Sequence, residues 1–241
     1  MDIAYHRNKF IERGFQRVID VWGADHHGHA IRFAASMKAP VLGLEDKKLD
    51  FLIMQMVRLV RGNEVVKVSK RTGKALTLND LMDEIGVDAC RFFYNAKPDT
   101  HLEFDLDLAV RQDSENPVYY VQYAHARICT LLANMAAEGH AVPKCCEADL
   151  TLLTDEHEIE LIKQLSALPE EIRLAARDYD PSRINRYVIE LAARFHRFYN
   201  ACRLKGAEEN VLAARLVLAN AVRQVIAASL GIVGVIAPEK M

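Results

Sequence analysis

A short basic segment, residues 64–73 (EVVKVSKRTG), has the residues with the clearest chemical use in this sequence. It places three cations and a hydroxyl within five positions: Lys67, Ser69, Lys70 and Arg71. Such groups on a loop can hold a polyphosphate whose negative charge shifts during a reaction. A lysine-rich loop can equally be a solvated surface segment, so the neighbouring sequence has to decide between the two interpretations.

The neighbouring sequence predicts elements that would hold this loop in place. The apolar run 49–60 (LDFLIMQMVRLV) predicts a buried strand before the loop. Thr77, with Asp80 three positions later, predicts a capped helix start after it. A strand, a basic loop and a helix in this order favour the phosphate-binding interpretation.

A second candidate site is the segment 22–29 (WGADHHGH), which follows a predicted strand at 17–22. Open α/β sheets bind ligands where a strand's carboxyl end turns into a helix. Gly23 allows close backbone approach, and a helix start favours phosphate. Asp25 either contacts a ligand or only caps the predicted helix, which runs to about residue 38. His26 and His29 lie one turn apart, but no Cys or Glu lies beside them, so we predict no metal site.

Composition and cysteine usage narrow the class of protein. With 51% apolar and 27% charged residues, the 241-residue chain fits one large or two medium globular domains. Its five cysteines form no CxxC pair, which favours a reducing cytoplasm without disulfides or a zinc ribbon. No uninterrupted apolar run reaches about 18 residues, so no membrane span is predicted. The net charge of −2 does not decide for or against nucleic acid.

The predicted elements divide the chain near Asp105. Before it, a helix at 2–13, strands at 17–22, 40–44 and 49–60, and helices at 25–38, 78–85 and 88–96 predict a parallel sheet with few strands. After it, helices at about 107–137, 155–178, 182–204 and 208–231 predict a bundle. The predicted fold is an α/β partial Rossmann-type nucleotide-binding segment in residues 1–104, followed by an all-α helical bundle in residues 105–241.

Two features of the bundle suggest RNA contacts. On the predicted helix 182–204, an arginine stripe falls within an arc of roughly 80°: Arg183, Arg186, Arg194 and Arg197. Such a stripe suits phosphate contacts, although Glu190 lies within it and internal ion pairs are the alternative. On the first helix, Asn116 and Pro117 predict a helix start. Three tyrosines follow that could stack on splayed bases or pack in the core: Tyr119, Tyr120 and Tyr123.

In order along the chain, these motifs resemble the carboxyl-terminal portion of a bacterial arginyl-tRNA synthetase, a class I aminoacyl-tRNA synthetase. Residues 67–71 (KVSKR) resemble the KMSKS loop, and residues 88–91 (DACR) resemble the DALR motif of the anticodon-binding bundle, where Asp88 would also cap a helix. Residues 2–6 (DIAYH) and 116–127 (NPVYYVQYAHAR) fit as well. Residues 26–29 fit the pattern HxGH, but only about 40 residues separate them from the loop, too few for the HIGH motif.

The resemblance implies ATP-dependent attachment of arginine to its tRNA in the cytoplasm. It assigns catalysis to Lys67, Ser69, Lys70 and Arg71, and ATP contacts to Gly23, Asp25, His26 and His29. Arginine would contact Asp2 and Asp25, and tRNA would contact the tyrosines, the arginine stripe and Met241. The substrates would be arginine, tRNA and ATP with Mg²⁺, and no tightly bound cofactor is predicted.

Family members carry a longer amino-terminal part with the HIGH motif, which would be a further partner of this chain. The alternative is a catalytically inactive, stand-alone tRNA-binding module. We expect that this chain alone does not form arginyl-adenylate, because half of the nucleotide site would be missing. Arginine-dependent ATP–pyrophosphate exchange, measured with tRNA present, should equal the buffer background. Turnover that survives purification to homogeneity would contradict this and would reinstate residues 26–29 as a working motif.

Overall fold

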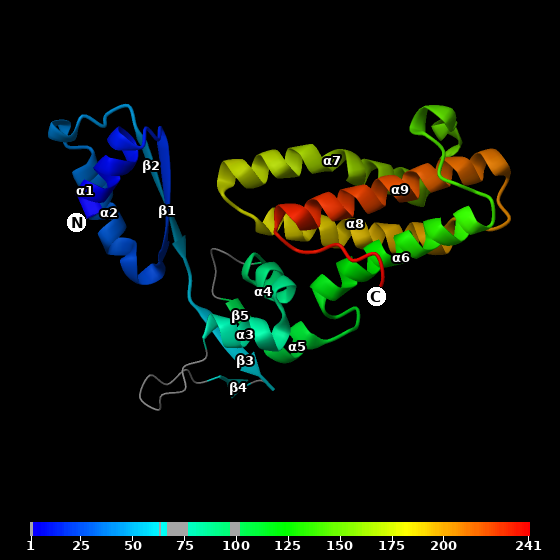
Figure 1. The fold of residues 1–241 in the computed structure, drawn as a ribbon, viewed down its shortest axis with the longest axis horizontal. Helices are drawn as coiled ribbons and strands as arrows, with labels where there is room; N and C mark the ends of the chain where they lie inside the picture. The colour runs from blue at the N-terminus through cyan, green and yellow to red at the C-terminus, as the bar shows by residue number, and fades with distance from the viewer. Residues whose placement is uncertain (1, 63, 67–76, 97–101) are drawn as a thin grey trace. The chain divides into compact units, whose positions relative to one another are not determined.

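The structure, a computed structural model, describes residues 2–62, 64–66, 77–96 and 102–241 (Figure 1). The predicted catalytic residues Lys67, Ser69, Lys70 and Arg71 lie outside these ranges. The chain forms two compact units: among the described residues, unit 1 takes in those up to Arg58 and residues 102–103, and unit 2 takes in Leu59–Ala96 and Phe104–Met241. This division differs from the predicted boundary after residue 104, because Leu59–Ala96 packs with the helices that follow.

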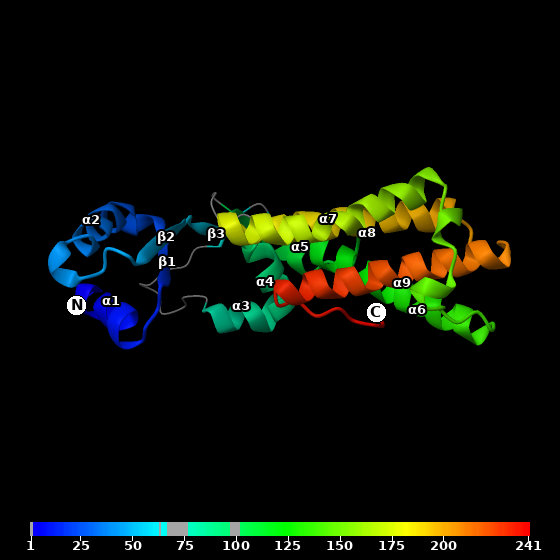
Figure 2. The same ribbon diagram turned by 90° about the horizontal axis from the view of Figure 1, so that it is seen from above.

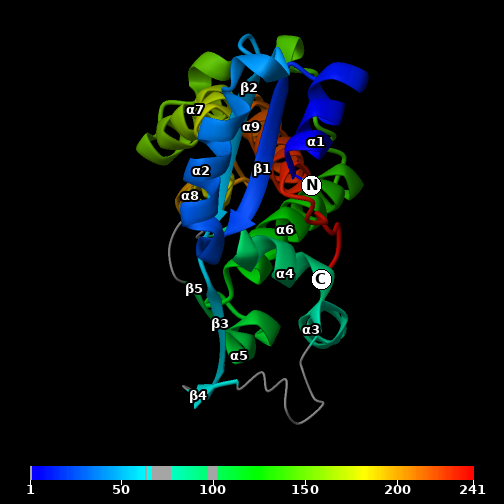
Figure 3. The same cartoon turned by 90° about the vertical axis from the view of Figure 1, so that its left-hand side faces the viewer.

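Unit 1 is built around two parallel strands joined by a helical crossover. Its elements are α1 (Asp2–Arg7), the π-helix η1 (Asn8–Glu12), β1 (Arg17–Gly23), the 3-10 helix η2 (Ala24–His26), α2 (His27–Met37), the 3-10 helix η3 (Pro40–Leu42) and β2 (Lys48–Met54). The strands pair in register from Arg17 opposite Lys48 to Gly23 opposite Met54, and Figure 3 shows them side by side.

The two faces of β1 differ in burial. Val18 and Asp20 are buried, whereas Ile19 and Val21, which alternate with them, are 43% and 60% exposed. The buried face packs into an apolar cluster that also contains Phe10, Phe33, Met37 and Leu44. The alternation of apolar positions thus sets which face of the strand the helices cover.

The predicted single strand at 49–60 is wrong, because the run contains two strands of different sheets. β2 ends at Met54, and β3 (Val57–Arg61) lies between β4 (Glu64–Val65) and β5 (Leu102–Asp105) in a second sheet. The predicted strand at 40–44 is also wrong, since η3 occupies most of it. A largely apolar run cannot reveal a change of pairing partner, because apolar residues continue from one strand into the next.

Unit 2 is mainly helical. Its helices are α3 (Leu78–Ile85), α4 (Val87–Tyr94), α5 (Leu106–Val110), α6 (Pro117–Ala137), α7 (Glu156–Asp178), α8 (Ser182–Ala201) and α9 (Glu209–Ile232), with 3-10 turns η4 (Cys145–Glu147) and η5 (Leu150–Leu152) between α6 and α7. Figures 1 and 2 show α6 to α9 side by side as a bundle. The predicted bundle is confirmed, except that the expected helix 107–137 is two helices, α5 and α6.

Local capping explains two of these helix starts. At α3, Thr77 accepts from the backbone N–H of Asp80, and the Asp80 carboxylate accepts from the backbone N–H of Thr77, a complete capping box. At α6, the Asn116 side chain accepts from the Val118 N–H, and Pro117 takes the first position. Both predicted starts are confirmed. Asp88, in contrast, does not cap α4, because Gly86 holds the cap position.

Helix α8 supplies the centre of the bundle. Its inward side chains are at most 1% exposed: Ile184, Val188, Leu191, Phe195 and Phe198. They pack against α6, α7 and α9. By length and composition alone, α9 would pass as a membrane span. Its buried residues, among them Leu216 and Val222, instead pack against the other three helices, as in the core helix of a bundle.

A buried ion pair joins α7 to α9. Glu158 is 1% exposed, and its carboxylate accepts from the Arg215 Nε at 2.6 Å and from the Asp155 backbone N–H at 3.0 Å. Arg215 also donates to the Arg203 carbonyl at 2.7 Å, in the connection between α8 and α9. One arginine therefore holds the ends of three helices together.

Replacing Arg215 by Met should destabilise the protein by about 3 kcal/mol, because the Glu158 carboxylate would stay buried without a cationic partner. Urea unfolding followed by far-ultraviolet circular dichroism measures the loss. The matched control is Arg173→Met on α7. It removes an exposed ion pair between Arg173 and Glu170 of the same helix and should leave the unfolding midpoint unchanged. Equal midpoints for the two variants would show that the buried pair contributes no more than the exposed one.

Candidate ligand cavity and nucleic-acid interface

Unit 1 contains a cavity of about 370 Å³ at the carboxyl end of β1. It is lined by side chains from α1, β1 and the start of α2: Asp2, Tyr5, His6, Lys9, Asp20, Trp22, His26 and His29. The position at the end of a parallel strand is the one expected for a ligand site in an α/β sheet.

A polar network forms the floor of this cavity. The His6 ring lies 2.8 Å from the Asp2 carbonyl through Nδ1 and 2.6 Å from the Asp20 carboxylate through Nε2. Lys9 donates to the other Asp20 oxygen at 3.1 Å. The Lys9 Nζ also lies 3.2 Å from the His6 Nε2, so His6 and Lys9 both surround the Asp20 carboxylate. The network balances the charge of a carboxylate that is only 8% exposed.

The structure brings together some of the predicted ligand residues and not others. Asp2 and His29 meet at 3.3 Å, and His26 lies in the same cavity wall. Asp25 does not line the cavity, and its side chain is 81% exposed. The prediction that Asp25 caps α2 is wrong, because Asp25 lies inside η2 and His26 holds the cap position without a side-chain bond.

Gly23 lies close to the exposed side chain of Asp25. A Cβ at position 23 would lie 2.7 Å from the Asp25 Oδ1, which is closer than real Cβ atoms approach. In this structure, the group that comes close to the Gly23 backbone is the Asp25 side chain, whereas the prediction concerned a ligand. The assignment of Gly23 and Asp25 to a ligand stays a prediction.

Sequence reasoning missed five cavity residues: Tyr5, His6, Lys9, Asp20 and Trp22. One signal was available for Asp20, because it sits at an inward position of a strand between Val18 and Trp22 and needs polar partners there. Trp22 contributes an aromatic wall, since its ring stacks on His29 at a centroid distance of 5.2 Å.

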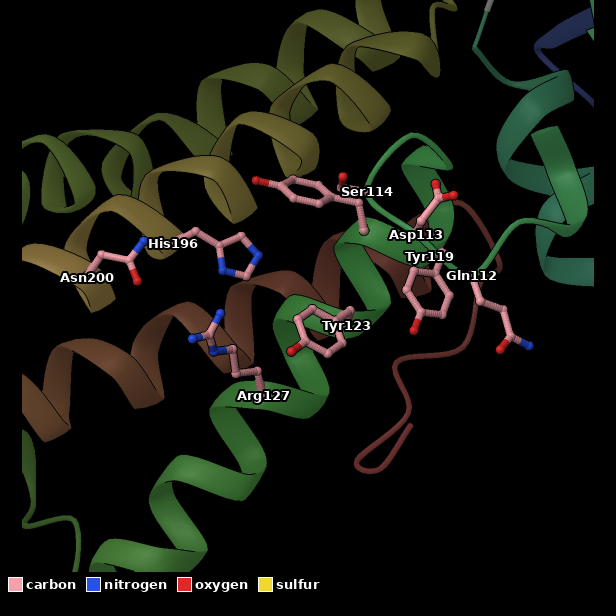
Figure 4. Close-up of a pocket in the computed structure, with 9 residues that line it drawn as sticks. Gln112, Asp113, Ser114, Tyr119, Tyr123, Arg127, His196 and Asn200 are labelled. Atoms are coloured by element: carbon pink, nitrogen blue, oxygen red, sulfur yellow. The ribbon is translucent and has the colours of Figure 1, made fainter.

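Unit 2 contains an aromatic pocket of about 520 Å³ between α6 and α8 (Figure 4). We use this name for the hollow lined by Gln112, Asp113, Ser114, Tyr119, Tyr120, Tyr123, Arg127, His196 and Asn200. All three predicted tyrosines are among these residues. The turn-by-turn spacing of α6 places Tyr119, Tyr123 and Arg127 in one row, and α8 supplies His196 and Asn200 from across the pocket.

The rings in this pocket are arranged as a stacking surface. Tyr119 and Tyr123 are nearly parallel, with centroids 6.2 Å apart and 8° between the planes. Tyr123 stacks with His196 at 6.3 Å, and Tyr120 lies 5.1 Å from the same ring. Tyr123 is 41% exposed, so a flat ligand can reach it from solvent.

The aromatic pocket is lined by one cation, Arg127, and one carboxylate, Asp113. Burial, and secondarily the nearby Arg127, lowers the pKa of His196 below its ordinary value, so the imidazole is neutral at pH 7. Burial raises the pKa of the Tyr120 hydroxyl. The Arg127 guanidinium lies 4.2 Å from the Tyr199 ring centroid, which holds it against the helix surface. The uncharged rings with the Arg127 cation held beside them suit a base and its phosphate.

The arginine stripe of α8 is engaged in ion pairs within the bundle. Arg194 pairs with Glu160 and with Glu190, and Arg197 pairs with Glu190 at 3.0 Å. Arg183 lies 3.4 Å from Glu171, and Arg186 lies 3.2 Å from Asp180. The structure thus agrees with the alternative interpretation, in which the stripe forms internal ion pairs. None of the four arginines lines the aromatic pocket.

Met241 lies in a further hollow of about 600 Å³, together with Tyr119 and Gln112. These two residues also line the aromatic pocket, so the two hollows are neighbours. Within the described ranges, no group of three or more His, Cys, Asp or Glu residues is placed to hold a metal ion.

The helical bundle identifies the family. The model of the DALR anticodon binding domain matches residues 121–241, half of the chain, and the chain therefore belongs to this family. Along its full length, the chain is 54% identical to an arginine–tRNA ligase of Acetivibrio thermocellus and 53% identical to one of Caldanaerobacter subterraneus. It spans 42% of the length of each relative. The predicted resemblance is confirmed.

Solved structures agree with these relatives. The Campylobacter jejuni protein assigned as an arginyl-tRNA synthetase superposes with a TM-score of 0.86 at 36% identity, over all of this chain and 51% of that one. The Thermus thermophilus arginyl-tRNA synthetase superposes with a TM-score of 0.70 over 94% of this chain and 41% of that one. At 22% identity, the latter likeness concerns the fold alone.

The pKa of His196 gives a test of the pocket's electrostatics. We expect its NMR titration midpoint to lie below about 6.5, the ordinary value. The unfolded chain then takes up this proton at a higher pH than the folded chain, so the stability linked to His196 is present at pH 7 and is lost as the pH falls through about 6.5. Arg127→Gln should raise the midpoint, because it removes one of the two causes of the shift. A wild-type midpoint at or above 6.5 would contradict the burial of His196.

Proposed function

We propose that this chain is the part of an arginine–tRNA ligase that binds the anticodon loop of its tRNA and completes the site for arginine and ATP. The observation that carries the proposal is the aromatic pocket, in a chain that belongs to the DALR anticodon binding domain family. The similarity to arginine–tRNA ligases extends along all of this chain, and it supports an arginine tRNA as the partner. In this proposal, residues 1–104 belong to the catalytic domain and residues 105–241 form the anticodon-binding domain, and both work in the cytoplasm.

In the catalytic part, β1, α2 and β2 would form one crossover of a Rossmann-type nucleotide-binding sheet. The cavity at the end of β1 has the charge pattern that a free amino acid needs. Asp2 offers a carboxylate to a guanidinium or ammonium group, and Lys9 offers a cation. His26 and His29 lie on the same wall and would face ATP. The KVSKR segment would hold the phosphates of ATP with Mg²⁺ as charge develops on the pyrophosphate.

In the bundle, a splayed anticodon base would stack on the row formed by Tyr119 and Tyr123. Each stacked base contributes about 1–3 kcal/mol in proteins that bind single strands. Arg127 would then meet a phosphate of the same nucleotide. Arg186 and Arg197, whose side chains are 63% and 54% exposed, are the members of the stripe best placed for further phosphate contacts.

Tyr123→Ala should weaken binding of an arginine tRNA transcript about tenfold or more, because one stacking surface is lost. Arg127→Gln should reduce the slope of log affinity against log salt by about one, because one phosphate contact is lost. Filter binding across a salt series measures both effects. The control is Ile162→Ala, an exposed apolar truncation on α7. If Tyr123→Ala binds as tightly as this control, the pocket is not the RNA site.

A further inference from the structure

The last residues of the chain, 233–241, form a tail that returns along α4 and α6. The tail is held mainly through its backbone. Arg91 donates to the Gly234 carbonyl at 2.5 Å, and the Asp88 carboxylate accepts from the Ile236 N–H at 3.3 Å. His125, which is 3% exposed, donates from Nδ1 to the Pro238 carbonyl at 2.8 Å. The contacts thus fall on every second residue of the tail.

We call the contacts of Asp88, Arg91 and His125 with the tail the clamp. Gln122 and Gly234 complete it. The Gln122 Nε2 donates to the Asp88 carboxylate and to the Ile236 carbonyl, both at 2.9 Å, so it joins α6 to α4 and to the tail. Gly234 has a φ of 72°, and a Cβ there would lie 3.2 Å from the Arg91 Nη1. A larger residue would be strained in this conformation and would press on the arginine. The position therefore requires glycine for the clamp to close.

The clamp sorts the apolar side chains of the tail into buried and exposed ones. Val233 and Val235 are 7% and 4% exposed, and they anchor the tail to the bundle. Ile236 and Met241 are 68% and 55% exposed, although both are large and apolar. Both line the hollow of about 600 Å³ that also contains Tyr119. Backbone tethering thus leaves two apolar side chains beside the proposed base-stacking row.

We propose that Asp88 and Arg91, the two charged residues of the DACR motif, are positioning residues for RNA binding. They hold the tail by its backbone so that Ile236 and Met241 form a second wall next to Tyr119. A nucleotide adjacent to the one stacked on Tyr123 would lie against this wall. This inference rests on the proposed function, but the clamp itself can be tested without RNA.

The first arm of the experiment measures the tail alone. Carboxypeptidase should release the last residues from the Asp88→Ala and Arg91→Ala variants faster than from the wild type. Asp83→Ala removes the same charge from an exposed position on α3 and should release them at the wild-type rate. Asp88→Asn keeps the side-chain volume and serves as the second variant if Asp88→Ala fails to fold. Wild-type release rates in all clamp variants would overturn the proposal.

The second arm measures affinity for an arginine tRNA transcript. Asp88→Ala should lose about as much affinity as deletion of residues 236–241, which removes both wall residues, and it should lose nothing more when combined with that deletion. If Asp88→Ala weakens tRNA binding by the shortened chain as much as it weakens tRNA binding by the full chain, the positioning role is overturned, because Asp88 would then act without the tail. If Tyr123→Ala binds the tRNA as tightly as the wild type, while the Asp88 and Arg91 variants lose their last residues to carboxypeptidase faster, the proposed function fails but the clamp is still supported. If Tyr123→Ala binds weakly but Asp88→Ala does not, only the further inference fails.

Discussion

Helix α8 must keep one whole face away from water, and the arrangement of unit 2 follows from this constraint. Burying a large apolar side chain contributes about 1.5–3 kcal/mol, and Leu191, Phe195 and Phe198 are all fully buried. In this structure α6, α7 and α9 surround that face and cover it. The same helix then presents His196 and Asn200 toward α6, so the packing that makes the core also makes the aromatic pocket.

Polar contacts give this apolar packing a single register. The buried Asn185 side chain donates to the Phe92 carbonyl at 2.7 Å, which joins α8 to α4. Glu158 and Arg215 do the same for α7 and α9. Unpaired, either group would be costly to bury, so each bond selects one arrangement among several that would cover the apolar faces equally well. The tail contacts of Asp88 and Arg91 extend the same principle to the end of the chain.

What the sequence predicted correctly was local, and what it missed depended on partners far along the chain. The capping box of Thr77 with Asp80 and the start at Asn116 involve neighbours within three residues. Asp88 was misassigned as a cap because its partner, Ile236, lies 148 residues away. The arginine stripe was visible on α8, but Glu160, one of its partners, lies on α7. The aromatic pocket could be anticipated from its tyrosines but not from His196, since only tertiary packing brings α8 to α6.

The single tryptophan lies in unit 1, while most of the helix lies in unit 2. Trp22 contacts Phe51 and His29, so its fluorescence reports the packing at the end of β1. Helical circular dichroism instead reports mainly the bundle. Since two units with separate cores need not unfold together, these optical probes need not give coincident transitions. A melting temperature quoted for this protein therefore describes the part of the chain that the chosen signal observes.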